Sequence, residues 1–157
     1  LWHNPPFSRY NNGIVQKGGL FMDTIIAYWS KTGHSRKIAR HIGETLGLPV
    51  VDIRQQIPQA HTVVLISGIY AGKSDPKLLQ AVRQMNPHST QRIILILTCA
   101  DPDAHNDDLR TVLAQKGLTV DAQGHMCPGG FLFIRCTRPN QKDLAQAADF
   151  VRNALNK

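Results

Sequence analysis

The chain has 157 residues, of which 18 are Lys or Arg and 11 are Asp or Glu, so its formal net charge is +7. This length provides one domain with a sizeable core but hardly two. No apolar run approaches the roughly 20 residues that a membrane-spanning helix needs, and the three cysteines are too few for a disulfide framework. We therefore expect a cytoplasmic protein with reduced thiols and no membrane partner.

Residues 1–21 differ in composition from the rest of the chain. They contain several Gly, Pro and Asn breakers, no acidic residue, and no helical or strand period. Met22 then opens the first strand. We hypothesise that residues 1–21 are an irregular N-terminal extension, not native to the protein, and that one domain covers residues 22–157.

From Met22 onward, apolar runs that favour strands alternate with helical patterns. In chain order we expect a strand at Thr24–Tyr28, a helix at Gly33–Leu46, strands at Pro49–Ile53 and Thr62–Ser67, a helix at Asp75–Met85, a strand at Arg92–Thr98, a helix at Asn106–Lys116, an edge strand at Leu118–Asp121 and a helix at Gln141–Leu155. This alternation predicts an α/β protein with a doubly wound, five-stranded parallel sheet covered on both faces.

Two connections need separate comment. Arg54–His61 contains Pro58 and leaves room for at most one helical turn. Gly124–Arg138 has no clear assignment, because Phe131–Ile134 has strand character and would either complete or duplicate the fifth strand. Cys127–Gly130, directly before it, is expected to be a turn.

The turn after the first predicted strand is the most informative feature of the chain. Ser30, Thr32 and Ser35 supply hydroxyls, and Gly33 allows a close approach to the backbone. The turn precedes a helix, whose first N–H groups are unpaired and whose dipole is positive at that end. Such a turn suits a phosphate group, although the same residues would also serve as an ordinary helix cap.

Residues 28–35 resemble the FMN-phosphate loop of short-chain flavodoxins, whose pattern is Ser/Thr-x-Thr-Gly-x-Thr. The matching positions are Ser30, Thr32 and Gly33, with Ser35 in place of the last Thr and His34 where Asn is common. The resemblance implies a flavodoxin-like domain with strand order 2-1-3-4-5 and FMN as the cofactor. It further implies that the phosphate is bound by Ser30, Lys31, Thr32, Gly33, His34 and Ser35.

The resemblance also implies that the flavin ring lies between the loops after the third and fourth predicted strands. Its expected contacts are Gly68, Ile69, Tyr70, Ala71, Gly72, Thr98, Cys99, Ala100 and Asp101. Tyr70 is expected to stack on the ring, and either Gly68 or Gly72 to supply a residue that tolerates positive φ. The loop after the fourth strand lacks the aromatic residue that is usual in this family, and Phe131 is a candidate to replace it.

These features predict an FMN-binding electron-transfer protein that works with redox protein partners or a small redox substrate, as a monomer or weak dimer. Flavodoxins are acidic, so the basic charge of this chain predicts a less negative flavin potential. The Lys and Arg residues are scattered and accompany no recognition motif, which argues against a nucleic-acid partner.

Three other functions stay open. One is a flavodoxin-like FMN-dependent oxidoreductase that acts on a quinone or a porphyrin precursor, and another is a flavin-free interaction module. The third is a nucleotide-binding enzyme, because Ser67–Ser74 reads as a P-loop with Ser in place of the first Gly. Against the third, Asp75 and Pro76 stand where a nucleotide would need N–H donors. The pairs Cys127 with His125 and Cys99 with His105 lack partners at zinc-site spacing.

Overall fold

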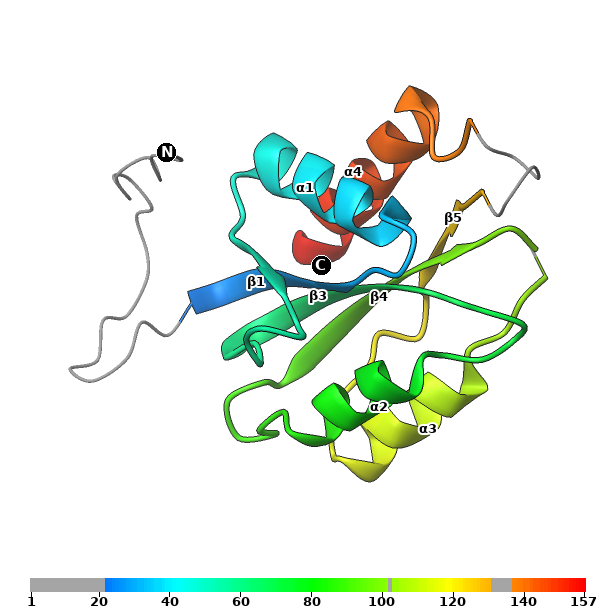
Figure 1. The fold of residues 1–157 in the computed structure, drawn as a ribbon. Coiled ribbons are helices and arrows are strands. Elements are labelled where there is room, and N and C mark those ends of the chain that lie inside the picture. The colour runs from blue at the N-terminus through cyan, green and yellow to red at the C-terminus, as the bar shows by residue number, and fades with distance from the viewer. Residues whose placement is uncertain (1–21, 102, 131–136) are drawn as a thin grey trace.

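The computed structural model describes residues 22–101, 103–130 and 137–157. Its elements, in chain order, are β1 (Met22–Trp29), α1 (His34–Leu46), β2 (Val50–Asp52), β3 (Ala60–Gly68), α2 (Pro76–Arg83), β4 (Arg92–Cys99), α3 (Asp107–Gln115), β5 (His125–Pro128) and α4 (Gln141–Leu155). The five strands form one sheet in the order β2-β1-β3-β4-β5, and every neighbouring pair is parallel (Figure 1). The predicted doubly wound sheet is therefore confirmed.

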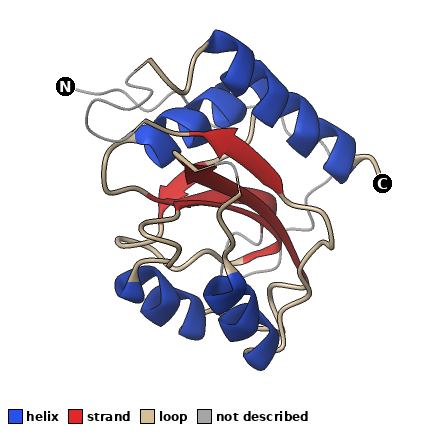
Figure 2. Cartoon of the chain, turned by 90° about the vertical axis from the view of Figure 1, so that its right-hand side faces the viewer, coloured by secondary structure: helices blue, strands red, loops and turns tan. Residues whose placement is uncertain are grey.

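The sheet is the middle of three layers. Helices α1 and α4 cover one face and helices α2 and α3 the other, as Figure 1 shows and as the turned view of Figure 2 repeats. Successive side chains of a strand point to opposite faces, so in β1 Ile26 and Tyr28 pack toward α1 and α4. Ile25 and Trp29 pack toward the layer of α2 and α3. Two hydrophobic cores result, one on each side of the sheet.

The fifth strand is where the prediction was wrong. Strand β5 is His125–Pro128 and pairs with Ile96–Cys99 of β4, whereas Val120 makes only an isolated parallel bridge to Ile93. The chain thus runs beside the start of β4, leaves the ladder, and rejoins it after Gly124. A Cβ at Gly124 would lie 3.4 Å from the Leu95 carbonyl oxygen, so the chain comes into contact with β4 again at this residue.

The remaining predicted elements are present, with ends shifted by up to two residues. Cys127 and Pro128, expected in a turn, belong to β5, and the expected strand at 131–134 lies outside the described residues. The connection from Ile53 to Gln59 contains a turn but no helix, as its length and Pro58 predicted. This short connection leaves part of one sheet face without a helix.

Candidate functional site

The turn between β1 and α1 is closed by hydrogen bonds within itself. The Ser30 hydroxyl accepts a hydrogen bond from the Gly33 N–H at 2.9 Å, and the Gly33 carbonyl accepts one from the Lys37 N–H at 3.0 Å. Gly33 has a φ of 94°, a left-handed conformation that costs a residue with a side chain roughly 1–2 kcal/mol. The backbone of the turn therefore requires glycine at this position.

The first turn of α1 differs from the first turns of the other helices. Its N-cap residue, Gly33, has no side chain to cap the helix, and no acidic residue stands in the first turn. The other three described helices carry a side-chain cap or an acid there, namely Asp75 at α2, Asp107 and Asp108 at α3, and Asn140 with Asp143 at α4. The positive end of α1 thus lacks the internal carboxylate or cap that the others have, which makes it suited to an external anion.

The hydroxyls around this turn face different ways. Ser35 is only 2% exposed, and its hydroxyl lies 3.3 Å from that of Thr98 at the end of β4. Thr32 is exposed, and its hydroxyl lies 3.2 Å from Nδ1 of His34. Burial, with a smaller effect of the Lys37 charge, lowers the pKa of His34 from its ordinary value of 6.5, so its ring is neutral at pH 7. Thr32 and His34 therefore offer accessible polar atoms, whereas Ser35 joins the turn to β4.

Lys31 connects the β1–α1 turn to the loop after β3. Its backbone N–H donates to the Tyr70 hydroxyl at 3.3 Å, and its ammonium lies 5.0 Å from the centre of the Tyr70 ring. The same ammonium forms an ion pair with the Asp75 carboxylate at 3.2 Å. Two loops that the sequence predicted to share a site are therefore in direct contact through these three residues.

The loop after β3 is a tight hairpin. Tyr70 and Lys73 exchange two backbone hydrogen bonds, and the residues between them, Ala71 and Gly72, have φ values of 50° and 73°. Positive φ at both positions matches a type I′ turn. Of the two glycines left open by the sequence, Gly72 is therefore the one with positive φ. Gly68 serves another purpose, because a side chain there would lie 2.7 Å from the Tyr70 hydroxyl oxygen.

The end of this loop is held by two carboxylates. Asp108 accepts hydrogen bonds from the Ser74 N–H at 2.8 Å and the Ser74 hydroxyl at 3.0 Å. Asp75 is the N-cap of α2 and accepts from the Lys77 N–H at 2.9 Å. In the segment that resembles a P-loop, the Ser74 N–H is thus bonded to a carboxylate, and the Tyr70 and Lys73 N–H groups are bonded to backbone carbonyls. These bonds argue against the nucleotide-binding alternative.

The third loop approaches the other two from β4. The Cys99 carbonyl accepts a hydrogen bond from the Gly129 N–H at 2.9 Å, and the Cys99 sulfur lies 3.8 Å from the Ile69 carbonyl oxygen. Ala100 is half-buried and Asp101 is exposed. Among the residues that the structure describes, this loop carries no aromatic side chain, and Phe131 lies outside that set.

The structure thus brings the predicted residues of all three loops to one edge of the sheet. The sequence did not predict that Asp75, Asp108 and Gly129 hold these loops together. Their only signal was position, since Asp75 and Asp108 lie at predicted helix starts and Gly129 lies in a predicted turn. Within residues 22–101, 103–130 and 137–157, no cluster of three His, Cys, Asp or Glu side chains is arranged to hold a metal ion. Nor does that part of the chain contain a helix whose length and apolarity would let it cross a membrane.

The fold defines a doubly wound α/β protein, in which the uncapped N-terminus of α1 lies at the carboxyl edge of the sheet. A model of the family described as flavodoxin domain matches residues 25–135, more than half of the chain. The chain belongs to this flavodoxin family.

Solved structures support the fold. A flavodoxin from the domain Archaea is 16% identical with a TM-score of 0.59, over 84% of this chain and 98% of that one. Flavodoxin 2 from Bacillus cereus is 13% identical with a TM-score of 0.61, over 86% and 99% of the two chains. Rubredoxin oxygen:oxidoreductase from Desulfovibrio gigas is 17% identical with a TM-score of 0.59, over 85% of this chain but 36% of that one. No curated protein matches the chain by sequence.

Proposed function

We propose that the protein binds FMN, with the phosphate at the β1–α1 turn, and carries electrons through the flavin. The observation that carries this proposal is the start of α1, where a glycine with a φ of 94° replaces a capping side chain and no acid occupies the first turn. A helix end of that kind attracts a phosphate dianion by its free N–H groups and by its dipole.

The residues at the turn fit a phosphate chemically. Ser30 uses an oxygen lone pair to accept from Gly33, so its hydroxyl hydrogen stays available to donate. Thr32 is exposed and can turn its hydroxyl from His34 toward a ligand. Arg36 on α1 carries a positive charge, and its guanidinium lies 3.8 Å from the point where a Gly33 side chain would begin. Donors and positive charge are thus present together, without a nearby first-turn carboxylate.

The loops after β3 and β4 would hold the flavin ring, which supplies the redox chemistry when bound. The protein's own residues orient these loops. Lys31 and Tyr70 set the distance between the first two loops, and Asp108 fixes the end of the second. The ring of Tyr70 lies against Gly68 and beside Lys31, so it borders both the proposed phosphate site and the second loop.

The test is the visible absorption of the purified protein, followed by titration of flavin-free protein with FMN. We expect flavin absorption and a tight complex. Thr32→Ala should weaken FMN binding about 10–100-fold, because a hydrogen bond to a charged group contributes about 1.5–3 kcal/mol. Thr111→Ala, at an exposed position of α3, is the matched control and should leave the affinity unchanged. Failure of the flavin-free protein to take up FMN would refute the proposal.

A further inference from the structure

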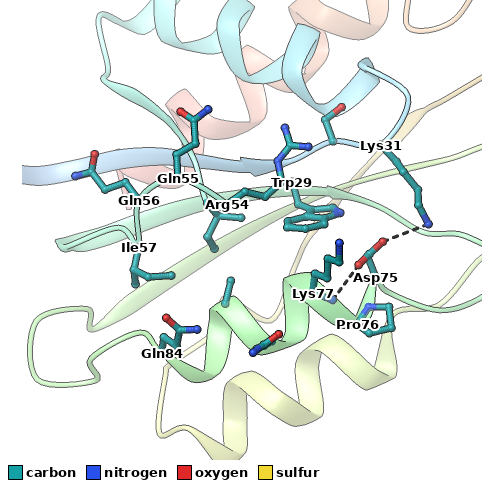
Figure 3. Close-up of a pocket in the computed structure, with 14 residues that line it drawn as sticks. Trp29, Lys31, Arg54, Gln55, Gln56, Ile57, Asp75, Pro76, Lys77 and Gln84 are labelled. Atoms are coloured by element: carbon teal, nitrogen blue, oxygen red, sulfur yellow. Dashed lines mark hydrogen bonds and ion pairs between the residues drawn. The ribbon is translucent and has the colours of Figure 1, made fainter.

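A groove lies beside the Lys31–Asp75 ion pair, and both residues line it. Its volume is about 970 Å³, and it runs between the loop that follows β2 and helix α2. Figure 3 shows Ile57 of that loop pointing toward Gln84 of α2 and Trp29 lying near Lys77, while the side chains of Gln55 and Gln56 point away from the helix. One end of the groove reaches Ser30 and Lys31 of the β1–α1 turn.

The groove exists because the crossover from β2 to β3 has no helix. In a doubly wound sheet, such a crossover normally places a helix on the sheet face. Here Ile53 to Gln59 is a short turn, while α2 and α3 lie farther along the same face, near β3 and β4. Within the described residues, the edge of this face at β2 therefore lacks a helical cover, whereas Ala27 and Trp29 of β1 are buried in the core that they share with α2.

The charge that the groove presents to solvent is positive. Lys31 is 60% exposed and its partner Asp75 only 8%, and Arg54 is 45% exposed while its partner Asp52 is 7%. In each pair the cation points outward and the carboxylate lies underneath. Lys77 adds a third exposed cation to the lining, and among the residues that the structure describes Asp75 is the one acidic residue that lines the groove.

The groove also combines apolar and amide groups. Trp29, Ile53, Ile57 and Ala81 form its apolar part, and its glutamines are Gln55, Gln56, Gln80 and Gln84. The Arg54 guanidinium lies 5.4 Å from the centre of the Trp29 ring. The Trp29 indole N–H is buried without a hydrogen-bond partner among the described atoms, which leaves one donor unsatisfied at the floor.

We propose that this groove docks an amphipathic, acidic helix of a partner protein, which completes the helical layer that the β2–β3 crossover leaves open. Apolar side chains of such a helix would pack on the half-buried Ile57, and its carboxylates would meet Lys31, Arg54 and Lys77. The proposal does not depend on flavin binding. Because the groove ends at the β1–α1 turn, the partner would nevertheless lie next to the proposed phosphate site.

Charge argues against the two occupants that the chain itself could supply. Residues 1–21 contain Arg9 and Lys17 and no acidic residue, so their charge has the same sign as the rim of the groove. A second copy of the chain carries a net charge of +7, and like charges at an interface oppose association. An external acidic partner is the complementary choice.

The test uses the full-length protein and a synthetic helical peptide with Leu on one face and Glu on both flanks. Amide chemical shifts in NMR spectra report the contact. We expect the peptide to shift the amides of Gln80, Ala81 and Gln84, and the peptide with Lys in place of every Glu to bind at least about tenfold more weakly. Lys77→Glu should also weaken binding of the Glu peptide about tenfold. Arg83→Glu is the matched control on the same helix, at an exposed position that does not line the groove.

Four results would overturn the proposal. The first is equal binding of the two peptides or no binding of either, and the second is equal effects of Lys77→Glu and Arg83→Glu. The third is a shift of the Gln80 and Gln84 amides in a Trp2→Ser, Phe7→Ser double variant without peptide, which would show that residues 1–21 occupy the groove. The fourth is a shift of the same amides on dilution, which would show that a second copy does.

Discussion

The β1–α1 and β3–α2 turns have the same place in the fold but differ in their backbone amides. Carboxylates of the protein accept hydrogen bonds from amides in the second turn but not in the first. Both follow a buried strand, precede an amphipathic helix, and lie at the same edge of the sheet. At β3–α2, Asp75 and Asp108 accept the N–H groups of Lys77 and Ser74. At β1–α1, Gly33 provides no such acceptor, and the first turn of α1 contains no acid. The second turn is thus satisfied from within, whereas the first is suited to a ligand.

This difference explains why the glycine and hydroxyl content of a turn does not by itself show whether the turn binds a phosphate. The β3–α2 turn has Gly68, Gly72 and Ser74 and resembles a P-loop, yet its glycines serve a hairpin turn and the contact with Tyr70. What distinguishes the turns is where carboxylates stand relative to the helix start. A carboxylate at the N-cap or in the first turn takes the place of an external anion.

The largest effect is expected from placing a carboxylate at the β1–α1 turn. His34→Asp would put a negative charge in the first turn of α1 and repel a phosphate dianion. At roughly 5 Å and an effective dielectric of roughly 40, that repulsion is about 3 kcal/mol, or about 100-fold in FMN affinity. His34→Asn keeps the site neutral and is the control. Thermal stability of His34→Asp should not fall, because the acid suits the helix dipole, and equal FMN binding by both variants would contradict the comparison.

A smaller effect is expected from removing a carboxylate acceptor from the β3–α2 turn. Asp108→Ala removes the acceptor of the Ser74 N–H and hydroxyl and should lower the free energy of unfolding by about 2 kcal/mol. Denaturation by urea measures it. Asp107→Ala, at the exposed neighbouring position, should cost less than about 1 kcal/mol. If the two variants were equally stable, the bonds to Ser74 would not hold this loop.

Two variants of Asp75 distinguish the contribution of helix capping to stability from that of the ion pair with Lys31. Asp75→Ala removes both the cap of α2 and the partner of Lys31 and should cost about 1 kcal/mol. That corresponds to a fall of about 2–4 °C in Tm for a domain of this size. Asp75→Asn keeps a capping oxygen and loses only the ion pair with Lys31, whose ammonium is exposed to solvent, so it should cost less than Asp75→Ala. Calorimetry measures Tm for both variants. A larger fall in Tm for Asp75→Asn than for Asp75→Ala would be inconsistent with capping as the main role of Asp75.

The smallest effect concerns pH. Because the pKa of folded His34 lies below its ordinary value of 6.5, the unfolded chain takes up a proton first as pH falls. The contribution of His34 to stability is therefore complete above pH 6.5 and is lost as the pH drops toward the folded pKa. His34→Asn should lose slightly less stability than the parent between neutral and mildly acidic pH. Denaturation curves at several pH values test this, and a steeper loss in the variant would reverse the sign.

Much of the fold was predictable from the sequence because the strands and helices have clear periods. Runs such as Ile93–Leu97 are apolar throughout, as buried parallel strands require, and Gln141–Leu155 has one apolar face. The fifth strand was misplaced because Leu118–Asp121 and His125–Pro128 both run beside β4. Which of them forms the longer ladder depends on how the chain passes Gly124, a tertiary contact that has no local pattern.

The candidate site was predictable only in part. The position of Ser30–Ser35 followed from topology, since carboxyl ends of parallel strands meet at one edge. The contact of Lys31 with Tyr70 and Asp75, 39 and 44 positions away in the chain, could not be read locally. The groove beside Trp29 had one visible signal, the short connection after β2, but its cationic rim depends on which partner of each ion pair is exposed.

The most direct test of the central claim compares the affinities of flavin-free protein for FMN and for riboflavin, which differ only by the phosphate. If the β1–α1 turn binds the phosphate through its amides and hydroxyls, FMN should bind at least about 100-fold more tightly, the equivalent of two charge-assisted hydrogen bonds. That preference should be lost in His34→Asp and kept in His34→Asn. Equal affinity for the two flavins would contradict the account.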